Sequence, residues 1–225
     1  MQEMPPSLPP ERSRQELVET AWWLRLLLLV FAAAGVASLI SSSMQLELFF
    51  RPEWTAEQGD ANDARQAVVG YVRIGIYILS IIAFARWVLL ANRHARSLGA
   101  EGLAQTPGKA VLFFFVPFAN LVLPYRGMRQ LWQASHHPTA WQESPVPTLL
   151  PVWWGFWLAA NVFGRIAKVL GDAVHDLPSG ILSTQVSIFQ DVLTIVLGVL
   201  AWRVVSRITA AQLRAGEVPG GPHLP

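Results

Sequence analysis

Four long apolar runs constrain this chain more than any other feature of its sequence. They lie at about residues 21–40, 67–91, 149–170 and 186–208. Each run reaches the roughly 20 residues that an α-helix needs to cross a hydrocarbon core of about 30 Å. Charged residues make up only 14% of the chain and apolar residues 52%, against about 25% charged in soluble domains. The pattern predicts an all-α integral membrane bundle with four spans in one domain, residues 21–208.

A fifth apolar stretch, residues 110–124, differs from these four. Pro117, Asn120 and Pro124 interrupt it, and its apolar part is too short for a simple crossing. We therefore expect a re-entrant or broken segment that enters the bilayer and returns. Apolar and polar residues then alternate at helical spacing over 124–135, which predicts an amphipathic helix lying in the membrane interface.

The basic residues are distributed as the positive-inside rule requires if residues 110–124 are re-entrant. Twelve of the 17 Lys and Arg then fall on the cytoplasmic side: Arg12, Arg14, Arg25, Arg86, Arg93, Arg96, Lys109, Arg126, Arg129, Arg203, Arg207 and Arg214. If the segment crosses instead, the two sides carry nearly equal numbers. The first reading predicts both termini in the cytoplasm, with a disordered, Pro-rich tail over residues 1–20 and a flexible tail over 209–225.

Four charged residues lie inside the predicted spans, each in the outer third of its span: Arg73, Arg165, Lys168 and Asp191. Ionisable groups within a membrane are costly and face a partner or water. One interpretation is a polar vestibule for an anion or a proton. The other, which we prefer, is a structural ion pair of Asp191 with Arg165 or Arg73.

Two further candidate sites surround the interrupted segment. The break at Pro117, Asn120 and Pro124 predicts either a ligand site made of freed carbonyls and the Asn120 side chain, or a hinge. Arg126, Arg129 and Trp132 are candidate contacts for anionic lipid head groups. Ordinary positive-inside anchoring explains the two arginines equally simply, and we prefer it.

The sequence contains little that indicates an enzyme. It has no cysteine, which excludes disulfides and thiolate metal sites. The histidines lack metal-ligand spacing, and we find no nucleophile elbow, phosphate-binding loop or dinucleotide fingerprint. We predict no catalytic residues, no metal and no cofactor, and the absence of a basic block argues against nucleic acid.

The region from Arg86 to Ser135, followed by Trp153 and Trp154, resembles a known family. The matching residues are Asn92, Ala95, Leu98, Gly99, Pro107, Gly108, Pro117, Asn120, Leu121, Pro124, Met128, Leu131, Trp132 and Ser135. They resemble the bacterial membrane family called domain of unknown function 4328, from about Trp22 to Arg207. The chain departs from the family at Phe113–Phe115 and at Leu123. The resemblance implies a multi-pass protein of the bacterial inner membrane, and it implies no activity.

These observations together predict a non-enzymatic membrane scaffold or interaction module. The alternative is a small transporter or channel that uses the break at Pro117–Pro124 and the outer charges. The expected partners are the lipid bilayer, including anionic lipids, and a second copy or another membrane protein.

Overall fold

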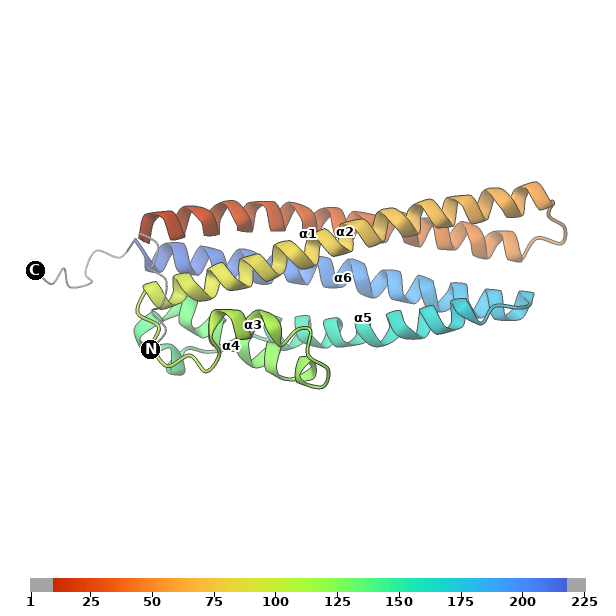
Figure 1. Cartoon of the computed structure of the whole chain (residues 1–225). Coiled ribbons are helices and arrows are strands. Elements are labelled where there is room, and N and C mark those ends of the chain that lie inside the picture. The colour runs from red at the N-terminus through yellow and green to blue at the C-terminus, as the bar shows by residue number, and fades with distance from the viewer. Residues whose placement is uncertain (1–9, 218–225) are drawn as a thin grey trace, which may run out of the picture. The chain divides into compact units, whose positions relative to one another are not determined.

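The computed structural model describes residues 10–217, and every regular element within that range is a helix (Figure 1). The elements are α1 (Pro10–Phe49), α2 (Ala56–Ser97), α3 (Pro107–Leu112), η1 (Ala119–Leu121), α4 (Leu123–His136), η2 (Pro138–Glu143), α5 (Leu149–Asp172) and α6 (Leu177–Ala215). The chain is therefore all-α. The parts of the predicted tails at residues 1–9 and 218–225 lie outside the described residues.

Three helices, α1, α2 and α6, are long and apolar enough to cross a membrane. They contain the predicted runs at 21–40, 67–91 and 186–208. The fourth run, 149–170, lies in α5, whose 24 residues extend about 36 Å at 1.5 Å per residue. The α5 helix, which carries Asn161, Arg165 and Lys168, is not among those three. A fourth crossing therefore remains a prediction.

Helices extend into both of the ranges that the sequence predicts to be tails, residues 1–20 and 209–225. Residues 10–20 belong to α1 and residues 209–215 to α6. Ser13, Leu17 and Thr20 are buried in the first case, and Ala211 and Gln212 in the second. Spacings of four and three residues place the first set on one face of α1, and Ala211 and Gln212 follow the buried Ile208 of α6 by three and four residues. The Pro-rich, polar composition of these ranges indicated disorder, because composition does not take account of the helical spacing of the few residues that become buried.

The chain forms two compact units, each assembled from separate stretches of sequence. Unit 1 contains the described residues 10–25, 82–151 and 203–217. Trp87, Met128 and Leu131 are almost completely buried in it. The Trp87 indole N–H donates to Thr209 Oγ1 at 3.1 Å, and Gln212 Nε2 donates to Ala91 O and Ser135 Oγ at 2.9 Å each. These bonds connect α2, α4 and α6 within unit 1.

Unit 2 contains residues 26–81 and 152–202. In it α1 and α2 form one antiparallel pair of helices, and α5 and α6 form another (Figure 1). The Phe31 and Tyr77 rings stack across α1 and α2, and the Phe163 and Phe189 rings meet edge to face across α5 and α6. Unit 2 also buries polar side chains, among them Ser38, Ser42 and Asp191.

Candidate functional site

An ion pair between α2 and α6 lies at the centre of unit 2. Arg73 Nη1 donates to Asp191 Oδ1. The Asp191 side chain is fully buried, whereas the Arg73 side chain retains a quarter of its exposure. A buried carboxylate without a partner costs several kcal/mol, so this pairing allows Asp191 to be charged inside an apolar bundle.

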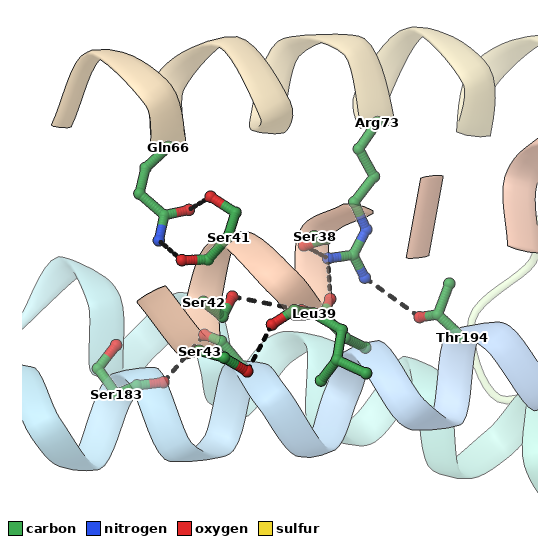
Figure 2. Close-up of polar contacts among 11 residues, drawn as sticks. Ser38, Leu39, Ser41, Ser42, Ser43, Gln66, Arg73, Ser183 and Thr194 are labelled. Atoms are coloured by element: carbon green, nitrogen blue, oxygen red, sulfur yellow. Dashed lines mark hydrogen bonds and ion pairs between the residues drawn. The ribbon is translucent and has the colours of Figure 1, made fainter. Parts of the chain in front are cut away.

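Hydroxyl groups complete the environment of the pair. Arg73 donates from Nη1 to Ser38 Oγ at 2.9 Å and from Nη2 to Thr194 Oγ1 at 3.2 Å. Ser42 Oγ donates to the second carboxylate oxygen, Oδ2 of Asp191, at 3.3 Å. Figure 2 shows the Arg73 side chain reaching from α2 toward Ser38 and Thr194. Both terminal guanidinium nitrogens and both carboxylate oxygens are thus engaged within α1, α2 and α6.

Two glycines allow α1 and α6 to approach closely enough for these bonds. A Cβ on Gly198 would lie 3.2 Å from both Ala32 Cβ and Leu28 O. A Cβ on Gly35 would lie 2.8 Å from Ile195 Cγ1. Small residues at helix interfaces permit such backbone approach in membranes. Ala32 and Gly35 of the first apolar run therefore face α6, and Gly35 lies next to Asp191.

A second group of polar side chains extends the site along α1 and α2. Ser41 Oγ donates to Gln66 Oε1 at 3.1 Å and accepts from Arg65 Nε at 3.1 Å. Gln66 Nε2 donates to Gln45 Oε1, and Gln45 Nε2 donates to Thr184 Oγ1 at 2.8 Å. Figure 2 shows the paired contacts of Ser41 and Gln66. The ion pair and these amides form one polar seam through the interior of unit 2.

Arg165 and Lys168, the other two charges of the predicted cluster, do not join this seam. Lys168 Nζ pairs with Asp172 one turn further along α5 at 2.8 Å, and both side chains are largely exposed. Arg165 is exposed on the same helix. Of the two partners considered for Asp191, the structure brings Arg73 to it.

The interrupted segment, in unit 1, is not one continuous helix. The α3 helix ends at Leu112, the chain turns through residues 113–118, and α4 begins at Leu123 after the short η1 helix. Pro124 lies in the first turn of α4, where its missing N–H costs no hydrogen bond. Asn120 lies in η1, and Pro117 precedes it in the turn.

The two ends of this segment are tied together by residues that the sequence reading did not single out. Gln105 Nε2 donates to Leu123 O at 2.8 Å, and Arg96 Nη2 donates to Gln105 O at 2.7 Å. The Ala104 N–H donates to Gln130 Oε1 at 3.1 Å. Residues 106–122 therefore leave and return to the same place in unit 1. We call residues 106–122 the hairpin and the contacts of Arg96 and Gln105 its clamp.

The candidate lipid contacts on α4 separate into two environments. Arg126 and Arg129 are exposed. Trp132 is buried and stacks on the His136 ring, with centroids 4.6 Å apart. The tryptophan therefore belongs to the packed interior of unit 1, and the arginines alone are available at its surface.

The sequence contains a signal for the seam, which is not visible when each charged residue is considered alone. Ser38, Ser41, Ser42 and Gln45 follow the spacing of one helix face on α1, as do Thr184, Asp191 and Thr194 on α6. Matching polar stripes on different apolar helices indicate faces that meet, since each would be costly in lipid. Within residues 10–217, His, Asp and Glu form no group of three able to hold a metal ion.

Comparison with known families supports the resemblance noted above. Residues 52–210 match the family described as Domain of unknown function (DUF4328). The chain belongs to this family. The matched part of this DUF4328 chain includes Arg73, Asp191 and the hairpin, while Ser38 and Ser42 lie before it. No curated protein and no solved structure matches the chain.

Proposed function

We propose that this DUF4328 protein is a non-enzymatic, multi-pass membrane scaffold or interaction module, and that the Arg73–Asp191 pair is a structural tie. The observation that carries this proposal is the engagement of both ends of the pair within α1, α2 and α6. A transport site needs groups that exchange their partners for a substrate. A fully engaged ion pair holds three helices together instead.

The proposal includes four crossings of a bacterial inner membrane, by α1, α2, α5 and α6. Both termini then lie on the cytoplasmic side. The partition of charge supports it. The twelve basic residues assigned above to the cytoplasmic side are the twelve that belong to unit 1, and the other five of the 17 belong to unit 2. Lys109 and Arg126, on the two sides of the hairpin, thus share one unit. The six residues of α3 extend only about 9 Å, far less than a bilayer core of about 30 Å.

A small transporter is the second candidate, and Gln190 is the observation that favours it. Its Oε1 atom is buried without a hydrogen-bond partner in the described chain. It directly precedes Asp191 in the sequence. A buried acceptor of this kind costs about 1–3 kcal/mol unless water or a ligand reaches it.

Ion flux through reconstituted vesicles distinguishes the two functions. The full-length chain is incorporated into vesicles, and proton and potassium leakage are followed with a pH-sensitive dye and a potassium electrode. A scaffold leaves both rates at the level of empty vesicles. Flux above that level, abolished by Asp191→Asn in a variant that still folds, would contradict the scaffold proposal and favour a transporter.

A further inference from the structure

The hairpin of unit 1 carries an exposed apolar tip next to exposed basic residues. Phe118 is 87% exposed, the largest value among the exposed large apolar side chains of the described chain. Leu112, Phe115 and Val122 are also exposed around it. A cluster of this size has to be covered, because each large apolar side chain left in water forgoes about 1.5–3 kcal/mol.

The backbone directs this tip outward at a cost. Phe118 has φ of 61° and ψ of −42°, the only positive φ outside glycine in the described chain. Such a conformation costs a bulky residue about 1–3 kcal/mol and persists where its surroundings hold it. The clamp of Arg96 and Gln105 holds the two ends of the hairpin together, so the tip cannot relax by unfolding into a longer loop.

The Asp, Glu, Lys and Arg residues between positions 102 and 142 all have one sign of charge. Residues 102–142 contain no Asp or Glu, whereas Lys109, Arg126 and Arg129 lie within them and are exposed. Lys109 lies on the arm that leads into the tip, and both arginines lie on α4, which leads out of it. A surface with an apolar centre and an exclusively cationic margin complements anionic lipid: acyl chains accept the ring and phosphates attract the cations.

We propose that the hairpin binds an anionic phospholipid leaflet, with Phe115 and Phe118 among the acyl chains and Lys109, Arg126 and Arg129 on the phosphates. This inference rests on the proposed membrane embedding and adds the lipid class that the protein selects. Trp132, a predicted lipid contact, has no part in it because it is buried. A second copy of the chain or a protein partner would cover the same tip without requiring lipid charge.

The first test counts bound lipid. The full chain is purified in a non-ionic detergent, and phosphatidylglycerol and phosphatidylcholine bound per chain are measured by native mass spectrometry. Arg126→Gln with Arg129→Gln should lower the preference for phosphatidylglycerol by roughly fivefold for each arginine removed. The matched control, Arg165→Gln with Lys168→Gln, removes two exposed cations from α5 and should leave the preference unchanged. If the α4 double variant and the α5 double variant prefer phosphatidylglycerol over phosphatidylcholine to the same extent, the proposal is overturned. If the α4 variant fails to fold, Lys109→Gln provides the same test with one charge.

The second test locates the tip, using a chain that has no native cysteine. A spin label at Phe115→Cys should be protected from a water-soluble relaxation agent in vesicles containing phosphatidylglycerol, whereas a label at Gln142→Cys, an exposed site on η2, should not. Equal accessibility at the two sites, or dimers that dissociate on Phe118→Ser, would overturn the proposal. The membrane embedding itself fails only if the long helices are also accessible to the agent. The two failures are therefore distinguishable.

Discussion

Arg73 donates to Asp191 from a helix that lies 118 positions away in the sequence, and the pair is enclosed by hydroxyl groups of α1 and α6. The effect of the pair on the stability of the fold follows from its burial. Removing one member of a buried ion pair costs about 3–5 kcal/mol, because the other charge is left without compensation, whereas replacing both members by apolar residues is often neutral.

Single and double replacements of this pair should therefore be strongly non-additive. Asp191→Leu or Arg73→Met alone should lower the free energy of unfolding by about 3–5 kcal/mol, and the double variant should recover most of that loss. The measurement is unfolding of the full chain in mixed micelles, followed by tryptophan fluorescence.

The matched control is the exposed pair of Lys168 and Asp172 on α5, where the same replacements should change little because solvent screens the charges. Additive losses at Arg73 and Asp191 would contradict the structural tie. A stable single variant at Asp191 would contradict it as well.

The approach of α1 and α6 depends on Gly198. Gly198→Leu would place side-chain atoms against Leu28 O and Ala32 and should lower the free energy of unfolding by about 1–3 kcal/mol. The control is Gly75→Leu, because a Cβ at Gly75 meets no atom within 4 Å. Equal melting temperatures for the two variants would show that α1 does not pack on Gly198.

The clamp should govern how readily the hairpin opens. Gln105→Ala removes the 2.8 Å bond from Gln105 Nε2 to Leu123 O, which is worth about 0.5–1.5 kcal/mol. Hydrogen exchange over residues 106–122 should then accelerate by roughly two- to tenfold, with the remainder of unit 1 unchanged. Gln142→Ala, at an exposed glutamine of η2, is the control. Unchanged exchange in the Gln105 variant would mean that other contacts close the hairpin.

The start of α6 should depend on pH. The Ser179 N–H donates to Asp176 Oδ1 at 2.9 Å, and the Asp176 N–H donates to Ser179 Oγ at 3.2 Å, forming a reciprocal cap. Hydrogen bonding from the Ser179 side chain and backbone holds the pKa of the Asp176 carboxyl below its usual value. Because the folded pKa is the lower one, the stabilisation is present above the usual carboxyl pKa and is lost as the pH falls through the depressed value.

Hydrogen exchange in the first turn of α6, compared with Asp176→Asn at each pH, measures this dependence. The difference between the two proteins should be present at neutral pH and should shrink in strong acid. A difference that is constant across this range would show that the carboxylate charge has no part in the cap.

The sequence predicts the helical class and the break near Pro117, because both depend on local composition and on proline chemistry. It also places Arg73 and Asp191 in one environment, since buried charges require partners. It does not distinguish Arg73 from Arg165 as that partner. The choice depends on how each helix is rotated about its axis, and contacts between residues distant in the sequence set that rotation. The clamp cannot be predicted from the sequence either, because nothing near Gln105 in the sequence indicates that it contacts Leu123.

The sidedness of the chain is the most direct test of this account. Single cysteines are introduced at Arg12, Pro52, Glu101, His175 and Glu217, all in the described part of a chain without native cysteine. They are labelled in intact cells with a membrane-impermeant maleimide. Four crossings predict labelling at Pro52 and His175 in intact cells, and at Arg12, Glu101 and Glu217 only after the membrane is opened. Labelling of cysteines at positions 12 and 217 from opposite sides would contradict the account, because the number of crossings would then be odd: either the hairpin crosses the bilayer or α5 does not.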